Sequence, residues 1–327
     1  MRSFYFPRKI VFLFVWMALS LIPMASAEDL SPDSAPVKKP QRIVSMTLGS
    51  DEILLSLVDP KRIVGVTYLA VDPKISHVAE AAKAVPYKIR LDLERVVALE
   101  PDLVLVASYT SPDFVKQLID ARLPVMKLEL FTSIPRIKQN ILAVGRAVGE
   151  EERARKVIEE MDRRIMEVKK KAASSKKRPG VLAYGPTGST AGRETTFDEM
   201  VTLAGGRNLA ADTGIVGHVN ISVERLVMID PEIIILSTWN PEAPGFEQIF
   251  LNDPALKQLS ALRAKQVHAI PEKYLTTVSQ YIVEGVEKMA RLIHPELFVS
   301  ERRNFFALGP ILSEGPLSPE SGAAARR

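Results

Sequence analysis

Two stretches of the chain, LERVVALEPDLVLVAS at residues 93–108 and VERLVMIDPEIIILST at residues 223–238, are nearly the same sixteen residues. In each, Glu-Arg follows the first residue, an apolar helical pattern comes next, and an acid-Pro-acid triplet and an aliphatic run follow. Proline lacks the amide proton that would continue a helix, so Pro101 and Pro231 each predict a helix end. The aliphatic runs predict buried strands. The repeat therefore indicates two related halves, each with the same helix-to-strand unit.

Glu94 and Glu224, near the starts of the two copies, have two possible roles. A glutamate in a first helical turn interacts favourably with the helix dipole, which would explain both residues structurally. They also stand at matching positions, 130 residues apart (224 minus 94), which suggests a shared function. From the residues alone, both roles stay open.

Strand-like and helical stretches alternate around both copies. Apolar runs are typical of strands covered on both faces, and their alternation with helices is typical of parallel sheets. Helices are expected at 134–148, 150–173 and about 277–294. Strands are expected at 42–46, 62–67, 103–108, 124–130, 180–184, 232–237 and 266–270. The sequence therefore predicts an α/β fold with two parallel-sheet lobes joined by one long helix.

The beginning of the chain has the pattern of an export signal. Arg2, Arg8 and Lys9 lead into an apolar run of thirteen residues, and Ala-Ser-Ala at 25–27 is a small-x-small cleavage signature. The run is shorter than the roughly 20 residues that span a bilayer. The predicted segments are a signal peptide at 1–27, a disordered leader at 28–41, an N-terminal α/β lobe at 42–149, a bridging helix at 150–174, a C-terminal α/β lobe at 175–298 and a disordered tail at 299–327.

Composition excludes several kinds of chemistry. The chain has no cysteine, so thiol catalysis, disulfides, cysteine metal sites and a lipid-anchored cysteine are excluded. The net charge of +4 would fall to +1 on cleavage, because residues 1–27 hold three basic residues and no acid. The basic charge therefore gives little support for a nucleic-acid partner. An exported protein without a lipid anchor is expected in the periplasm of a two-membrane bacterium.

Aromatic residues follow most of the predicted strands. Ligands of parallel sheets gather beyond the carboxyl ends of the strands, so these residues are candidate ligand contacts. Aromatic faces suit a flat macrocycle or a catecholate, although ordinary packing at domain edges would explain any single one. The candidates are Tyr68, Tyr109 and Phe131 in the first lobe and Tyr184, Trp239 and Tyr274 in the second.

The order and spacing of several motifs resemble the periplasmic substrate-binding proteins of ABC importers for iron chelates and vitamin B12. These motifs are RIVSMTLGSDEILLSL, RIVGVT, LDLERVVALEPDLVLV, LAGGRN, ISVERLVMIDPEIIIL and SQYIVEGVEKMARLIHPE, over about residues 42–298. The resemblance implies two lobes bridged by one helix, with the ligand in a cleft between them. It also implies one exposed glutamate per lobe that docks on arginines of the permease, and Glu94 and Glu224 match these positions.

Two basic residues stand six residues before the repeated glutamates, in loops that face the cleft in this family. They are Lys88 and His218, where the family's vitamin B12 binder carries tryptophans, so this chain departs from that pattern. A cationic pair suits an acidic chelate, and a neutral His218 is also able to ligate haem iron, although a solvated surface histidine is the more ordinary interpretation. Arg193 suits bidentate pairing with a carboxylate, with a solvated loop arginine as the alternative.

We therefore expect a monomeric periplasmic protein that captures an iron complex, a siderophore or haem, for the permease dimer of an ABC importer. Cobalamin or another corrinoid is the alternative ligand, and a ligand-presenting sensor or an enzyme on the same scaffold is less favoured. No nucleophile elbow or dinucleotide fingerprint supports an enzyme. Because the four histidines are scattered in the sequence, no cofactor or metal site of the protein's own is expected, and the metal should arrive already caged.

Overall fold

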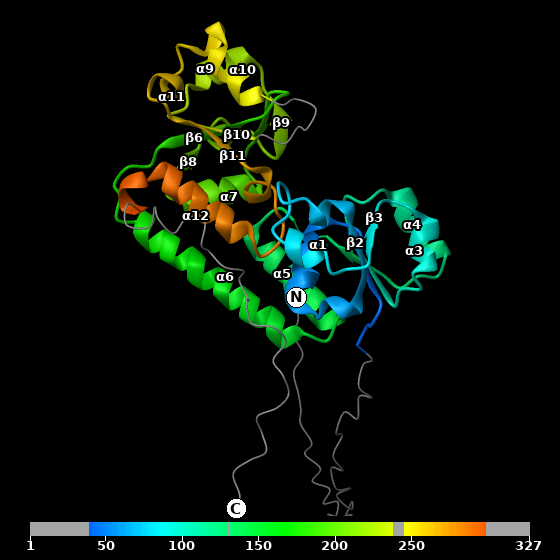
Figure 1. Cartoon of the computed structure of the whole chain (residues 1–327). Coiled ribbons are helices and arrows are strands. Elements are labelled where there is room, and N and C mark those ends of the chain that lie inside the picture. The colour runs from blue at the N-terminus through cyan, green and yellow to red at the C-terminus, as the bar shows by residue number, and fades with distance from the viewer. Residues whose placement is uncertain (1–38, 130, 238–244, 299–327) are drawn as a thin grey trace, which may run out of the picture. The chain divides into compact units, whose positions relative to one another are not determined.

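The first half of the chain forms a parallel sheet with helices between its strands. In the computed structural model, residues 39–129, 131–237 and 245–298 are described (Figure 1). The elements of this half are β1 (Ile43–Ser45), α1 (Leu48–Leu57), η1 (Pro60–Arg62), β2 (Ile63–Thr67), η2 (Tyr68–Val71), α2 (Ala79–Ala82), β3 (Tyr87–Ile89), α3 (Leu93–Ala98), β4 (Leu103–Ala107), α4 (Pro112–Asp120), β5 (Val125–Leu128) and α5 (Ile134–Ala147). The strands pair in the order β3-β2-β1-β4-β5, and every pair is parallel.

The second half repeats this plan after one long helix. Its elements are α6 (Glu151–Ala172), β6 (Gly180–Tyr184), β7 (Ser189–Ala191), α7 (Thr196–Leu203), β8 (Arg207–Asn208), α8 (Leu209–Asp212), β9 (His218–Asn220), α9 (Val223–Ile229), β10 (Ile233–Ser237), α10 (Phe246–Asn252), η3 (Pro254–Leu256), α11 (Ser260–Arg263), β11 (Val267–Ile270), η4 (Glu272–Tyr274) and α12 (Ile282–Ile293). A parallel sheet has the order β11-β10-β6-β8, and β7 and β9 form a separate antiparallel pair. The predicted α/β fold with two parallel sheets is confirmed.

The repeated stretches form α3–β4 and α9–β10, which place β4 beside β1 and β10 beside β6. Each helix ends two or three residues before its proline, as the prolines predicted. The residue before the proline, Glu100 or Asp230, takes a left-handed conformation with φ of 45° or 44°. This conformation turns the chain out of the helix and into the strand, because it cannot continue a right-handed helix.

The acid after each proline holds the start of a neighbouring strand. The Asp102 carboxylate accepts hydrogen bonds from the backbone N–H groups of Gln41 and Arg42, at 2.6 and 2.8 Å. The Glu232 carboxylate accepts one from the N–H of Gly180 at 2.7 Å. Each acid therefore accepts hydrogen bonds from backbone N–H groups at the start of the first strand of a sheet. Without the acid, these N–H groups would lack a hydrogen-bond partner. This shared task explains why the acid-Pro-acid triplet occurs twice.

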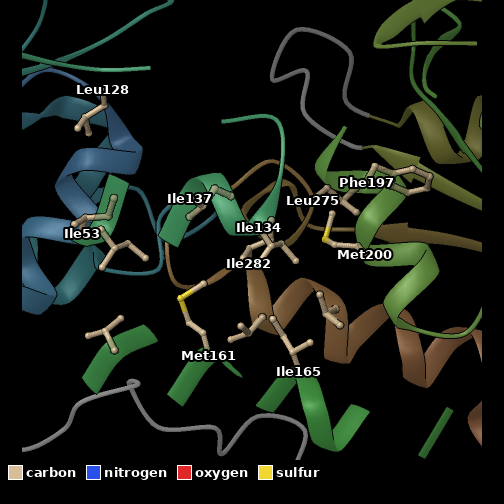
Figure 2. Packing of buried hydrophobic residues seen from close by; sticks show 14 of the residues in the cluster. Ile53, Leu128, Ile134, Ile137, Met161, Ile165, Phe197, Met200, Leu275 and Ile282 are labelled. Atoms are coloured by element: carbon tan, nitrogen blue, oxygen red, sulfur yellow. The ribbon is translucent and has the colours of Figure 1, made fainter. Parts of the chain in front are cut away.

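One hydrophobic cluster extends through both halves. It contains residues of β1, α1, α5, α6, α7, β10 and α12, including Ile43, Ile53, Ile137, Met161, Met200, Ile235 and Ile282 (Figure 2). Arg164 of α6 and Glu287 of α12 add a buried bidentate ion pair, with both N–O distances 2.8 Å. Because this core is continuous, the lobe limits of 42–149 and 175–298 stay predictions.

Short elements were the ones that the sequence did not reveal. Strands β3, β7, β8 and β9 have two or three residues each. The last helix begins at Ile282 rather than near Thr277, because residues 277–280 make contacts with α1 instead.

Lys39 and Gln41, at the end of the predicted leader, bind Glu150 and Asp102. The predicted signal peptide and tail lie outside the described residues. No helix in the described ranges is long and apolar enough to cross a membrane.

Candidate ligand site

The carboxyl ends of the five-stranded sheet carry one cation–π pair and one aromatic pair. Tyr68 follows β2 and Arg90 follows β3, and the Arg90 guanidinium carbon lies 3.7 Å from the centroid of the Tyr68 ring. Tyr109 follows β4 and approaches Phe131 beyond β5, with ring centroids 5.2 Å apart. The strand order places the first pair on one side of β1 and the second pair on the other. We call this set, with Thr47 after β1, the carboxyl edge.

Thr47 stands at the centre of the carboxyl edge and caps α1. Its hydroxyl accepts a hydrogen bond from the backbone N–H of Ser50, as an N-cap threonine does. The Tyr109 hydroxyl lies near Thr47, although Tyr109 as a whole is 61% exposed. Burial of this hydroxyl, near Asp51 and Glu52, raises the pKa of Tyr109 above its ordinary value. Most of the Tyr109 side chain is therefore exposed, while its hydroxyl lies near the start of α1.

Asp51 lies beneath the carboxyl edge and is fully buried. Its carboxyl group interacts with the backbone N–H of Thr67 at 3.2 Å and with the Thr67 hydroxyl at 2.5 Å. Burial raises the pKa of Asp51 to about 8, against the opposing effect of hydrogen bonds from Ser45 and Thr67. Asp51 is therefore mostly protonated at neutral pH. Its contacts hold α1 to the residue that precedes Tyr68.

Lys88 does not lie in a loop, which corrects the sequence expectation. It belongs to β3, is partly buried, and its ammonium donates to the backbone carbonyls of Lys83 and Val85. These bonds use two of its three N–H donors. Arg90, two residues later, is the exposed cation at this end of β3. Arg90 was not predicted as a site residue, because β3 is too short to be recognised in the sequence.

Arg193 and His218 are brought together by the small sheet of β7 and β9. His218 pairs with Ala191, and two residues on from Ala191, Arg193 forms a bridge with Val216. The Arg193 carbonyl accepts from the N–H of Gly217 at 2.8 Å. Both predicted cations are exposed. The sequence proposed them separately, and the structure adds that they share one strand pair.

Gly192 explains why these two segments approach so closely. A Cβ atom at Gly192 would stand 2.1 Å from the backbone oxygen of Ile215, a distance that only glycine avoids. Gly217 adds a left-handed turn with φ of 70° just before His218. The loop glycines therefore support strand pairing, which no pattern in the sequence predicted.

The other aromatic candidates of the second half are distributed differently. Tyr184 is 6% exposed and packs against Phe250, with ring centroids 5.5 Å apart. Its ring therefore belongs to the core, which corrects the expectation that it stands open at a strand end. Tyr274 is partly buried, next to the His77 ring at 5.3 Å. Trp239 lies outside the described residues. The roles of these three in ligand binding stay predictions.

Glu94 and Glu224 occupy the same place in the two repeats. Each is exposed in the first turn of its helix, two residues after an N-cap, Asp92 in α3 and Ser222 in α9. A hydrogen bond from the Ser222 hydroxyl and one from its own backbone N–H lower the pKa of Glu224. This geometry suits a charge at a helix start, and it leaves both carboxylates at the surface for a partner.

Within the described part of the chain, no three histidine or acidic side chains gather in a way that would hold a metal ion. The carboxyl edge combines aromatic faces with a guanidinium, and the β7–β9 sheet adds two basic side chains. This chemistry suits recognition of a conjugated ligand with acidic groups.

Comparison with known proteins places this geometry in context. Residues 43–274 match the family described as periplasmic binding protein. A Bacillus subtilis (strain 168) protein described as an uncharacterized ABC transporter substrate-binding lipoprotein, YvrC, is 27% identical over 280 residues, covering 83% of this chain and 86% of that protein. A cobalamin-binding protein of Halobacterium salinarum is 26% identical over 280 residues, covering 83% of this chain and 73% of that protein.

A solved structure shares the fold. It is the periplasmic heme-binding protein RhuT from Roseiflexus sp. RS-1 in its apo form, which is 26% identical to this chain with a TM-score of 0.69. The superposition covers 79% of this chain and 99% of that protein.

Proposed function

The chain belongs to the periplasmic binding protein family, and we propose that it captures an anionic iron complex and delivers it to the permease dimer of an ABC importer. The family membership confirms the predicted resemblance and the predicted role as a binding protein rather than an enzyme. The chain is thus an extracytoplasmic substrate-binding protein of an ABC transporter, with the class III periplasmic binding protein fold. The iron complex, a siderophore or haem, is the finer part of the proposal.

The carboxyl edge is the observation that carries this proposal. Tyr68, stacked under Arg90, and Tyr109, beside Phe131, flank the end of β1 with two aromatic surfaces. Strand ends at the point where the order of a parallel sheet reverses are the usual ligand sites of such sheets. Aromatic faces suit the conjugated plane of a porphyrin or a catecholate, and a guanidinium suits an acid group on its rim.

The cations of the β7–β9 sheet extend this chemistry to the second half. Arg193 and His218 are exposed on adjacent strands, and we propose that they meet acidic groups on the opposite side of the ligand. The ligand would then lie in a cleft between two lobes, bridged by α6. Under this proposal the site binds an acidic ligand more tightly than an uncharged ligand of the same shape.

A corrinoid is the second candidate ligand. The cobalamin-binding protein of Halobacterium salinarum is as similar to this chain as the heme-binding protein of Roseiflexus, with 26% identity in each case. Both ligands present a large macrocycle. The acidic groups of haem favour it here, because Arg90 and Arg193 are exposed cations and His218 is an exposed hydrogen-bonding side chain beside Arg193.

The remaining parts of the proposal concern the partner and the location. Glu94 and Glu224 are proposed to dock on basic sites of the permease dimer, one per half, with the protein acting as a monomer. Residues 1–27 are proposed to direct export to the periplasm and to be cleaved there. A role in presenting the ligand to a sensor would use the same site, and a loss of uptake in a deletion strain separates transport from sensing.

Ligand titration tests the proposal directly. The purified protein is titrated with haem, ferric catecholate and hydroxamate siderophores, cobalamin and molybdate, followed by quenching of tryptophan fluorescence. Trp239 is the only tryptophan after residue 27, which makes the signal simple to assign. We expect one site per chain and saturable quenching by at least one iron complex, with recovery of the ligand unchanged. Quenching by cobalamin with no response to any iron complex would reverse the ranking of the two ligands.

A further inference from the structure

A buried carboxylate of α1 binds the segment that leads into α12. Glu52 is 1% exposed, and its carboxylate accepts hydrogen bonds from the hydroxyl groups of Thr277, at 2.7 Å, and Ser279. Its backbone carbonyl accepts from the side-chain amide of Gln280 at 2.8 Å. Glu52 thus joins residues more than two hundred positions apart, from the first half of the chain to the second.

His77 forms a second contact at the same junction. Its backbone N–H donates to the Glu52 carboxylate at 3.1 Å, and its ring stacks on Tyr281 with centroids 4.6 Å apart and planes at 7°. The ring nitrogens lie 2.7 Å from the carbonyl oxygen of Lys273 and 3.4 Å from the carboxylate of Glu284. Glu52 binds Thr277, Ser279 and Gln280. The His77 ring is therefore held by Lys273, which precedes this segment, and by Tyr281 and Glu284, which follow it.

The Glu52 carboxyl group is held by hydrogen bonds. In the ranges that the structure describes, no basic side chain forms an ion pair with it, and three donors surround its two oxygens. A buried polar group requires its hydrogen-bond partners at fixed positions, because a lost partner leaves it unsatisfied away from water. This requirement makes the junction sensitive to small displacements between the two segments.

The same helical turn faces the carboxyl edge. Asp51 precedes Glu52 and binds Thr67, which stands just before Tyr68. Thr47 caps the helix and meets the Tyr109 hydroxyl. The first turn of α1 therefore has ligand-side residues on one side and the segment before α12 on the other. Gly49 belongs to this turn and packs against Val278, because a Cβ atom at Gly49 would lie only 2.7 Å from a methyl carbon of Val278.

We propose that Glu52 is a positioning residue that fixes the carboxyl edge relative to the second half of the protein, and so sets how long a bound ligand is retained. It does this without touching the ligand. The ligand part rests on the proposed function, whereas the positioning part concerns the protein alone. A residue needed only for folding would affect stability but not the geometry of the folded state.

Distance measurements by electron paramagnetic resonance test the positioning role. The chain has no cysteine, so Ile119→Cys and Met228→Cys, at two exposed positions of α4 and α9, add a clean pair of spin-label sites. In this background Thr277→Val and Ser279→Ala together remove two donors from Glu52. We expect a broader distribution of spin–spin distances than in the labelled parent. We also expect haem, used as the probe, to dissociate roughly tenfold faster, within the usual range of coupling between distant sites.

A matched control removes two hydroxyl groups that act within one half only. Ser56→Ala and Thr213→Val delete bonds to nearby backbone carbonyls of Ile53 and Ala210. This control should lower the melting temperature while leaving the distance distribution and the haem dissociation rate unchanged. If the Thr277/Ser279 variant behaves like this control, Glu52 is structural and the proposal is overturned. Broadening without faster haem release overturns the role in retention.

Two further outcomes are possible: the Thr277/Ser279 variant does not fold, or the parent protein does not bind haem. If the Thr277/Ser279 variant does not fold, Glu52→Gln is measured instead, since it keeps one acceptor oxygen and the volume of the side chain. An unchanged distance distribution in that variant overturns the proposal. If the parent protein itself does not bind haem, the choice of haem in the proposed function is wrong, and the distance distribution still decides the positioning role.

Discussion

The guanidinium carbon of Arg90 lies 3.7 Å from the ring centroid of Tyr68, at the carboxyl ends of two neighbouring strands. Stacking uses the face of the guanidinium and leaves its in-plane N–H donors for a carboxylate. Within the described residues Arg90 has no acidic partner of its own, in contrast to Arg164 or Arg163. We therefore propose that the pair receives an anion from outside the protein.

Replacement of Arg90 should weaken binding of acidic ligands selectively. For Arg90→Gln we expect a roughly ten- to hundredfold loss of affinity for an acidic iron chelate, the effect of one charge-assisted hydrogen bond. The affinity for a neutral chelate should change little. Isothermal titration calorimetry measures both, and Lys88→Gln is the control because its ammonium already binds backbone carbonyls. An equal loss in the Lys88 variant would mean that general charge, not Arg90, attracts the ligand.

The cations of the β7–β9 sheet should act on the same class of ligand. We expect Arg193→Gln combined with His218→Gln to lower the affinity for acidic chelates, with little effect on neutral ones, because lost charge matters where the ligand has the opposite sign. Arg207→Gln, which removes an exposed arginine paired with Asp212, serves as the control. The ratio of acidic to neutral affinities, measured by fluorescence quenching, decides the result. Equal losses for both ligand types would show that shape rather than charge is recognised there.

The fold was predictable from the sequence because its evidence is long and repeated. The aliphatic runs of β1, β2, β4, β6 and β10 are visible as patterns, and the repeat at 93–108 and 223–238 shows that two similar units exist. Arg90 was missed because β3 has only three residues, too few for a periodic pattern. Glu52 was missed for a different reason: its partners Thr277 and Ser279 are distant in the sequence, and no local pattern records such a contact.

Tyr184 shows the opposite error. It stands at a strand end and is aromatic, which together predicted an open ligand contact, yet it packs against Phe250 in the core. Position along a strand does not decide which way a ring turns, because neighbouring helices fill one face of the sheet. Tyr68 and Tyr109 remain exposed at corresponding strand ends.

Asp51 should make the stability of the protein depend on pH. Its pKa is raised from 3.8 to about 8 in the folded state, so between these values the folded protein holds a proton that the unfolded chain has released. Stability contributed by this proton is present at low pH and is lost as the pH rises toward 8. Asp51→Asn, which stays neutral, should therefore flatten the fall in the free energy of unfolding between pH 5 and 8. The expected difference between parent and variant is on the order of a few kcal/mol.

Urea unfolding at pH 5, 6, 7 and 8 measures this effect. The comparison of parent and Asp51→Asn isolates one group, because all other titrating residues are shared. Parallel curves for the two proteins would contradict the buried, protonated state of Asp51. Asp59→Asn serves as the control, since it makes the same change of side chain at the cap of a short surface turn.

The acid after each repeated proline should stabilise the fold and have no part in transport. Asp102→Asn weakens the acceptor for two backbone N–H groups, and Glu232→Gln weakens the acceptor for one. Each is expected to lower the free energy of unfolding by about 0.5–1.5 kcal/mol, with ligand affinity unchanged. Chemical denaturation and titration calorimetry test the two parts. A loss of uptake in cells without a loss of stability would place these acids in the interface with the permease instead.

For Glu94 and Glu224 we do expect a loss of uptake in cells without a loss of stability. Both are exposed in first helical turns at equivalent places of the two halves, where a symmetric permease dimer would offer one basic site to each. Exposed ion pairs contribute little, whereas charge pairs that lose their water in an interface are strongly coupled. Glu94→Lys or Glu224→Lys should therefore abolish uptake in cells and leave ligand affinity equal to that of the parent.

The two roles of these glutamates predict different outcomes. If they act only on their helix dipoles, each lysine should lower the melting temperature slightly and uptake should continue. If they dock on the permease, either change alone should reduce uptake to background, and the double variant should be no worse. Glu100→Lys, which changes an exposed acid just beyond the end of α3 in the first repeat, is the matched control and should transport normally. Normal uptake by the Glu94/Glu224 double variant would exclude docking, because no carboxylate would then remain at either site for the permease to bind.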